Sequence, residues 1–159
     1  MATNQKDPLQ DLREFLEVLN RREVLYLVIG AHAMSHWGYT RATGDLDILV
    51  QPSTENSLRV AEALREYGAP MKGIAPKDFT KPHQVLQLGV APLRIDILTS
   101  IDGVDEARVF RTSKKGELLG VPVRFINLPD LIKNKAASGR PKDILDVKEL
   151  RKVKKQAKQ

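Results

Sequence analysis

The sequence contains no cysteine, only one tryptophan and no long apolar run. Without cysteine the chain has no disulfide, no thiolate zinc site and no cysteine nucleophile. No stretch approaches the ~20 consecutive apolar residues of a membrane-spanning helix, so the sequence predicts no membrane association. The polar N-terminus, from Met1 to Asp11, also lacks the apolar segment of a signal peptide. Together these absences favour a cytoplasmic location.

What remains is the composition of an ordinary globular domain. Of the 159 residues, 42% are hydrophobic and 29% are charged. A chain of this length buries about 68–70% of the surface that its unfolded form exposes, which needs no help from disulfides or metals. A second independent core is not expected at this length. We therefore expect a single domain over residues 1–159.

The positive charge of the chain is concentrated at its C-terminal end. The formal net charge is +6, and residues 148–159 hold six Lys or Arg against the single acid Glu149, a net +5. Such a segment is typical of a frayed helix end whose cations complement the helix dipole. A tail that binds nucleic acid is the alternative interpretation. The rest of the chain is almost neutral, which favours the first.

Apolar spacing, capping residues and turn residues predict alternating helices and strands. Helices are predicted over residues 8–22, 31–37, 52–67, 104–110, 128–138 and 141–155. Strands are predicted over residues 24–29 and 45–50, as a hairpin of residues 83–88 and 93–98, and as a strand pair within residues 117–127. Residues 69–82, with three prolines and one glycine, indicate a loop. This order predicts an α+β fold (mixed α/β), in which helices pack on a mixed sheet and the chain ends in a helical segment.

Two of the predicted strands carry carboxylates where packing alone would require aliphatic residues. Asp45 and Asp47 lie in the run Asp-Leu-Asp-Ile-Leu-Val, and Asp96 lies in Arg-Ile-Asp-Ile-Leu. Side chains at i and i+2 share a face about 7 Å apart along a strand, and Asp96 joins that face if the two strands pair. At 4 Å and an effective dielectric near 20, each pair of like charges repels by roughly 4 kcal/mol. A cation is therefore expected among them, and an all-oxygen cluster suits Mg²⁺ or Mn²⁺. The loop 69–82 has room to border this face.

A strand also ends at a glycine upstream of these carboxylates, in Val28-Ile29-Gly30-Ala31. A helix that begins there leaves backbone N–H groups free, and phosphate can approach because Gly30 has no side chain. Turns of this kind also serve packing alone in many α/β proteins. By itself the turn therefore does not identify a phosphate site.

Taken together, these motifs resemble the DNA polymerase β-like nucleotidyltransferase superfamily. The resemblance rests on Ile29-Gly30-Ala31, Asp45-Leu46-Asp47-Ile48 and Ile95-Asp96-Ile97. The segment from Tyr39 to Asp47 and the late motif from Leu131 to Asp143 are similar to small bacterial and archaeal proteins related to abortive-infection toxin nucleotidyltransferases. The resemblance covers about residues 26–150. The family often has Gly-Ser or Gly-Gly at the phosphate turn, where this chain has Gly30-Ala31 and lacks the hydroxyl.

The resemblance implies metal-dependent transfer of a nucleoside monophosphate from a nucleoside triphosphate. Asp45 and Asp47 would hold the Mg²⁺ or Mn²⁺ bound to the triphosphate, and Asp96 with both of them would hold a second ion that activates the acceptor hydroxyl. The acceptor would belong to an RNA, a protein or a small molecule, and a toxin–antitoxin partner is implied as one setting. The expected nucleotide-binding residues are Gly30, Ala31, Arg41, Thr43, Lys135 and Arg140.

Two alternatives stay open at this point. In the first, Lys135 is a solvated helix residue and Arg140 pairs structurally with Asp143 or Asp146. In the second, the chain is a non-catalytic partner that kept the fold, such as an antitoxin or a nucleotide-sensing module. Ala31 at the phosphate turn and the short length of the chain motivate that second alternative.

Overall fold

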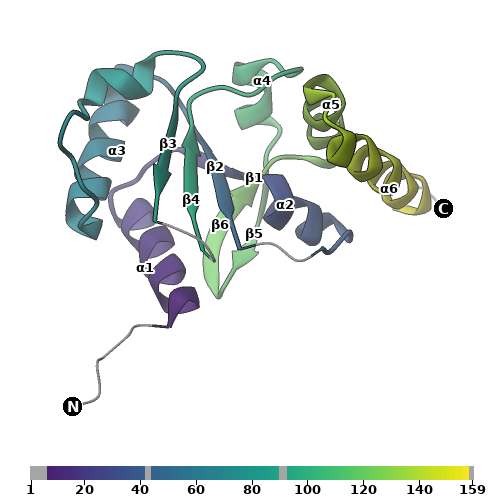
Figure 1. Ribbon diagram of the computed structural model, residues 1–159, viewed down its shortest axis with the longest axis horizontal. Helices are drawn as coiled ribbons and strands as arrows, with labels where there is room; N and C mark the ends of the chain where they lie inside the picture. Colours follow the sequence, from purple (N-terminus) through teal and green to yellow (C-terminus); the bar gives the residue numbers. More distant parts are fainter. Residues whose placement is uncertain (1–6, 42–43, 90–92, 158–159) are drawn as a thin grey trace.

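The computed structural model describes residues 7–41, 44–89 and 93–157, which form helices around one mixed sheet (Figure 1). The helices are α1 (Pro8–Arg21), α2 (Gly30–Trp37), α3 (Thr54–Tyr67), α4 (Glu106–Arg111), α5 (Leu128–Ser138) and α6 (Pro141–Ala157), with a 3₁₀ helix η1 (Pro76–Thr80). The strands are β1 (Tyr26–Ile29), β2 (Leu46–Val50), β3 (Val85–Leu88), β4 (Ile95–Leu98), β5 (Lys114–Leu118) and β6 (Val121–Phe125). The α+β fold expected from the sequence is confirmed.

The six strands are ordered β3-β4-β2-β1-β6-β5. Strands β2 and β4 are parallel, as are β1 and β6, while the other neighbouring pairs are antiparallel. In the β2–β4 pair, Asp47 lies directly opposite Asp96. Because paired residues of neighbouring strands point to the same face, this register places the two carboxylates side by side.

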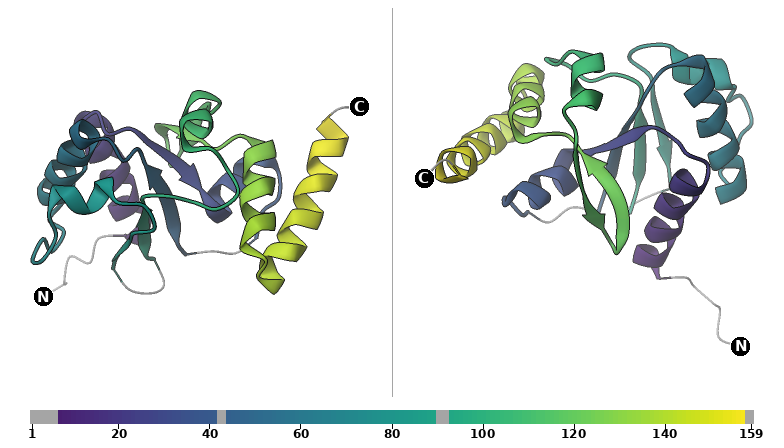
Figure 2. Two further views of the ribbon diagram at one scale, coloured as in Figure 1. Left: turned by 90° about the horizontal axis from the view of Figure 1, so that it is seen from above. Right: turned by 180° about the vertical axis from the view of Figure 1, so that it is seen from behind.

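The helices form two groups on opposite sides of the sheet. Helices α1 and α3 pack against each other on one side, whereas α2, α5 and α6 lie together on the other (Figures 1 and 2). Phe15, Leu16 and Leu19 of α1 are fully buried, and so are Leu27 and Ile48 in the central strands. The hydrophobic core thus extends through the middle of the sheet, where β1 is buried along its whole length.

Several helix ends follow the predicted capping pattern. The Asp7 side chain accepts a hydrogen bond from the backbone N–H of Leu9 at the start of α1, and Asn127 accepts one from Asp130 at the start of α5. Helix α3 ends at Gly68 and α5 at Gly139, both in the left-handed conformation that glycine adopts readily. The sequence-predicted helices are therefore confirmed within one or two residues at most ends.

Some boundaries and one loop differ from the sequence prediction. Strand β1 begins at Tyr26 rather than residue 24, and β5 begins at Lys114 rather than residue 117. The predicted loop 69–82 contains η1, whose Phe79 is buried and which packs against α3. Residues 148–157, in the segment predicted to be a frayed end, continue α6 to Ala157. None of the described helices is both long and apolar enough to cross a membrane.

Asn56 joins α3 to the central strands and provides a test of this architecture. Its side chain is buried, accepts a hydrogen bond from Leu25 N (2.7 Å) and donates to Leu25 O (3.0 Å) and Gln51 O (2.8 Å). We expect Asn56→Ala to lower the free energy of unfolding by about 3 kcal/mol, because it removes three part-buried hydrogen bonds to the backbone of Leu25 and Gln51. Urea unfolding measures this. Asn134→Ala is the control, because it removes a single exposed hydrogen bond, to Asp102 O. This variant should lower the free energy of unfolding by less than about 1 kcal/mol. Equal losses in the two variants would contradict the assigned role of Asn56.

Candidate functional site

The three aspartates singled out in the sequence line one cleft. Asp47 and Asp96 are register partners on β2 and β4, and Asp45 directly precedes β2. The cleft has a volume of about 500 Å³, and Gly30 and Ala31 at the start of α2 also line it. The expectation that Asp96 joins the face of Asp47 is therefore confirmed by the strand register. Residues 69–82, which were expected to border this face, do not line the cleft; residues 83–85 do.

Arg94 supplies the positive charge closest to the carboxylates, a role that sequence reasoning did not assign. Its Nε donates to Asp96 Oδ1 (2.8 Å), and one terminal nitrogen reaches Asp96 Oδ2 (3.2 Å) and Asp45 Oδ2 (3.3 Å). A signal was available, because residues 94 and 96 share a strand face by their spacing. The sequence argument required a cation at this place, and in the structure the guanidinium of Arg94 is that cation.

Asp47 is the least neutralised of the three carboxylates. Within the described part of the chain it has no ion-pair partner at contact distance. Burial, followed by repulsion from Asp96 and Asp45, raises the pKa of Asp47 from 3.8 to about 6, although Lys135 and Arg94 act in the opposite direction. The surroundings of the Asp47 carboxylate thus disfavour its charged form, and a bound cation would favour that form.

Gly30 allows this close packing of Asp47. Its φ is +65°, and a Cβ at this position would collide with Asp47 Oδ2. The glycine therefore leaves room for the carboxylate, in addition to exposing backbone N–H groups. Helix α2 begins here, and its N-cap residue Ile29 makes no side-chain capping hydrogen bond to the first N–H groups of the helix.

The basic residues predicted to bind the nucleotide lie on one wall of the cleft. Lys135 comes from α5, Arg140 from the turn before α6, and Arg41 from the segment before β2. Each is already ion-paired with a buried carboxylate of α6. Arg140 Nε lies 2.7 Å from Asp143 Oδ2, and Arg41 lies 3.2 Å from Asp146 Oδ2. The alternative interpretation of Arg140, a pair with Asp143, is thus correct as geometry. Thr43 lies outside the described residues.

The donors in this cleft fit a hard divalent cation by their chemistry, since all are carboxylate oxygens. Asp47 also has uncompensated charge for a cation to neutralise. The arrangement is not a closed metal cluster, however. Among the described residues, no group of three or more His, Cys, Asp or Glu side chains is disposed to hold a metal ion. Arg94 stands between Asp45 and Asp96, so an ion bound by all three aspartates would take the place of its guanidinium.

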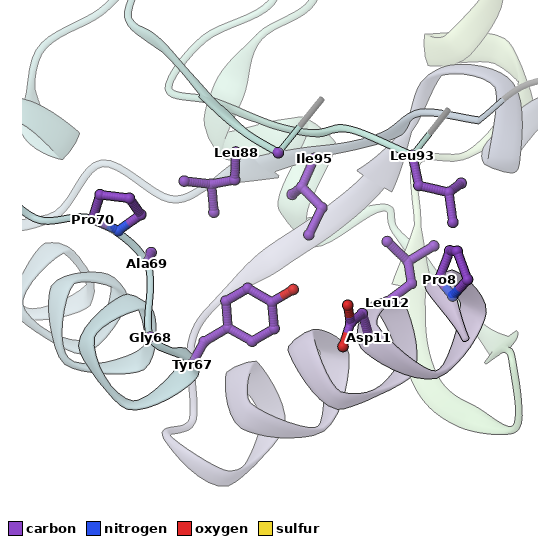
Figure 3. A pocket seen from close by; sticks show the side chains of 11 residues that line it. Pro8, Asp11, Leu12, Tyr67, Gly68, Ala69, Pro70, Leu88, Leu93 and Ile95 are labelled. Carbon is purple, nitrogen blue, oxygen red and sulfur yellow. The ribbon is translucent and has the colours of Figure 1, made fainter. Parts of the chain in front are cut away.

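A second cavity, of about 450 Å³, opens between α1, the end of α3 and the β3–β4 hairpin (Figure 3). Its lining is mainly apolar, including Leu12, Leu88 and Ile95, and Tyr67 directs its ring toward it. Asp11 is the only charged side chain among the described residues that line it. Because no set of chemically active groups converges there, the aspartate cleft is the candidate functional site.

Solved structures with the same fold are nucleotidyltransferases. The lincosamide antibiotic adenylyltransferase LnuA, in its lincomycin-bound structure, is 14% identical with a TM-score of 0.59, over 91% of this chain and 96% of that one. ANT(2'')-Ia, in complex with adenylyl-2''-tobramycin, is 15% identical with a TM-score of 0.58, over 92% of both chains. A putative nucleotidyltransferase from Thermotoga maritima is 15% identical with a TM-score of 0.57, over 93% of this chain and 92% of that one.

At these identities the structural similarity establishes the fold alone. No curated protein matches the sequence. A family model does match, however, over residues 8–159. The matched segment includes all three aspartates and the basic residues that line the cleft. On that match, the chain belongs to a family of nucleotidyl transferases of unknown function.

Proposed function

We propose that this protein transfers a nucleoside monophosphate from a nucleoside triphosphate to the hydroxyl of a small molecule, at the cleft of Asp45, Asp47 and Asp96. One observation carries the proposal. In a chain of a nucleotidyl transferase family, Asp47 and Asp96 are register partners on parallel strands and face the same cleft. The products are the nucleotidylated acceptor and pyrophosphate, which leaves as the acceptor oxygen attacks the α-phosphorus.

Asp45, Asp47 and Asp96 are the residues that would hold Mg²⁺ or Mn²⁺. When bound, such ions neutralise the phosphate oxygens and make the acceptor hydroxyl a better nucleophile. The chain itself supplies the orientation. Gly30 and Ala31 present the uncapped N-terminus of α2 to the cleft, where backbone N–H groups and the helix dipole favour a phosphate. Donors of this kind compensate for the missing hydroxyl at Ala31.

The cationic wall provides the remaining charge. Lys135, Arg41 and Arg140 line the cleft from one wall and would bind the oxygens of the triphosphate. Arg94 lies among the carboxylates instead, where it pairs with Asp45 and Asp96 as long as no ion takes the place of its guanidinium. The cleft thus has a cationic wall for phosphates beside a carboxylate group for metal ions.

A small-molecule acceptor is favoured over RNA or protein by two fold neighbours. LnuA is seen with lincomycin and ANT(2'')-Ia with an adenylylated tobramycin, and this chain aligns with at least 92% of each. A cleft of about 500 Å³ is also within the ~300–1,000 Å³ range of small-molecule sites. An RNA or protein hydroxyl, in a toxin–antitoxin setting, is the competing acceptor class.

The activity itself is tested with α-labelled nucleoside triphosphates, Mg²⁺ or Mn²⁺, and separate acceptor pools of hydroxylated small molecules, RNA and protein. We expect label transfer to a small molecule. Mutation of a residue that only orients a metal ligand typically lowers activity roughly 10- to 100-fold. Because Asp47 would itself bind the metal ion, Asp47→Asn should reduce the rate by more than that. Glu62→Gln, which changes an exposed acid of α3 outside the cleft, is the control and should leave the rate unchanged.

Three outcomes would contradict the proposal. Undiminished transfer by Asp47→Asn would show that the reaction does not take place at the assigned site. Transfer only to RNA or protein would replace the acceptor class. Triphosphate binding without transfer to any pool would favour the non-catalytic alternative, a nucleotide-sensing module.

The raised pKa of Asp47 predicts that the stability of the fold depends on pH. Its pKa of about 6 in the folded protein exceeds the ordinary 3.8, so the folded state binds this proton more tightly than the unfolded chain does. The stabilising contribution is therefore complete below about pH 4 and is lost as the pH rises through about 6. The difference corresponds to at most ~3 kcal/mol.

Asp47→Asn removes this titration. In metal-free buffer we expect the variant to be more stable than the wild type at pH 7 and the gap to close toward pH 4. Urea unfolding at pH 4, 5, 6 and 7 measures the difference, and the Glu62→Gln variant shows the contribution of an unrelated acid. A wild type-to-variant difference that stays constant with pH would show that Asp47 ionises without strain.

A further inference from the structure

Two buried carboxylates on α6 have no place in the chemistry described so far. Asp143 and Asp146 lie three residues apart, so they share one face of the helix. Both side chains are 0% exposed. An ionised carboxylate is expensive to bury unless cations compensate it. The question is therefore what this pair does at that place.

The charged partners of the pair all belong to the cationic wall. Lys135 Nζ lies 3.3 Å from Asp143 Oδ1 and 3.4 Å from Asp146 Oδ2. Arg41 reaches the same Oδ2 of Asp146 at 3.2 Å, and Arg140 reaches Asp143 at 2.7 Å. The Ser138 hydroxyl also donates to Asp143. Three cations from three different segments are thus gathered around two carboxylates.

We propose that Asp143 and Asp146 are positioning residues that hold Arg41, Lys135 and Arg140 together as one triphosphate-binding wall. The proposal rests on the proposed function and goes beyond it, because it assigns a role to residues that do not reach the reacting atoms. Asp146 is the central element, since it joins the segment leading into Asp45 to α5 through one shared oxygen.

Electrostatics explains why such a wall needs the carboxylates. Three cations brought to one wall repel each other before any phosphate arrives. Two carboxylates behind them reduce that repulsion and leave a net positive charge that still attracts a triphosphate. Burial alone would raise the pKa of Asp143, but hydrogen bonds from Ser138 and Arg140 and the charge of Lys135 lower it to about 2. These partners therefore favour the ionised form of the Asp143 carboxylate.

Asp146 is held by ion pairs and not by hydrogen bonds, so it does not use up the N–H donors of its two partners. Neither carboxylate oxygen of Asp146 accepts a hydrogen bond within the described part of the chain, although two cations lie at ion-pair distance. Buried ion pairs that serve structure alone are normally satisfied by hydrogen bonds. The ammonium of Lys135 has three N–H donors, and one of them binds Asp143. Donors of Lys135 and Arg41 therefore remain for phosphate oxygens in the cleft.

The test compares Asp146→Asn with a variant of equal burial outside the cleft. Asp130 on α5 is also buried and bonded to Asn127, and Asp130→Asn is the matched control. Calorimetry with Mg²⁺ first identifies which of the four nucleoside triphosphates the wild type binds most tightly. We expect Asp146→Asn to weaken that binding roughly tenfold, or ~1.4 kcal/mol, because Lys135 and Arg41 lose their shared partner. Binding of the corresponding nucleoside, which has no phosphate, should not change. Asp130→Asn should bind the triphosphate as the wild type does, even where thermal unfolding shows an equal loss of stability.

A double-mutant cycle with Lys135→Met separates positioning from general destabilisation. Because Asp146 acts through Lys135 as well as Arg41, the loss of triphosphate binding in the double variant should be smaller than the sum of the two single losses. In transfer assays, Asp146→Asn should raise KM for the triphosphate more than it lowers kcat. If Asp146→Asn does not fold, Arg41→Gln removes one partner from the surface side and should weaken triphosphate binding while sparing the nucleoside.

Two results would overturn the inference. One is a variant Asp146→Asn that loses stability as Asp130→Asn does yet binds the triphosphate normally. The other is full additivity of Asp146→Asn with Lys135→Met. Both leave the proposed function intact. If the wild type binds none of the four triphosphates, the proposed function fails first.

Discussion

Repulsion among three carboxylates in one cleft is the constraint on which the rest of this structure depends. The parallel pairing of β2 with β4 forces Asp47 and Asp96 side by side, and Asp45 enters the same cleft. Arg94 pairs with Asp96 and Asp45, whereas burial and repulsion from those two carboxylates raise the pKa of Asp47. The fold therefore maintains an unfavourable charge arrangement that burial of apolar residues elsewhere must offset.

The surrounding elements are arranged around that constraint. Gly30 lets α2 begin against Asp47, and the uncapped start of that helix adds positive potential. Opposite charge accumulates on the other wall, where α5 and α6 bring Lys135 into contact with Asp143 and Asp146. The cleft therefore has a carboxylate region at the sheet and a cationic region at the helices, the division of charge on which the proposed nucleotidyl transfer relies.

The carboxylates and the glycine could be predicted from the sequence because their signals are local. Asp47 and Asp96 interrupt aliphatic strands at alternating positions, and Gly30 follows a buried strand directly. Partners that depend on distant segments could not be predicted. The contact of Arg94 with Asp45 requires the β2–β4 pairing, and the Arg41–Asp146 pair requires α6 to lie beside the segment before β2. Strand β5 was predicted too short because Lys114 and Lys115 are exposed and have no apolar alternation. The helix η1 was missed because its prolines indicate a loop, while the burial of Phe79 against the core is a tertiary effect.

The central claim, that these aspartates hold a divalent cation for a nucleotide, is tested most directly by crystals grown with Mn²⁺ and a non-hydrolysable nucleoside triphosphate. Anomalous diffraction locates manganese independently of the protein atoms. The account predicts an anomalous peak coordinated by Asp47 and Asp96, with the triphosphate against Lys135 and the guanidinium of Arg94 displaced from Asp45. A triphosphate bound elsewhere, or Arg94 still between Asp45 and Asp96 with no manganese beside Asp47, would contradict it.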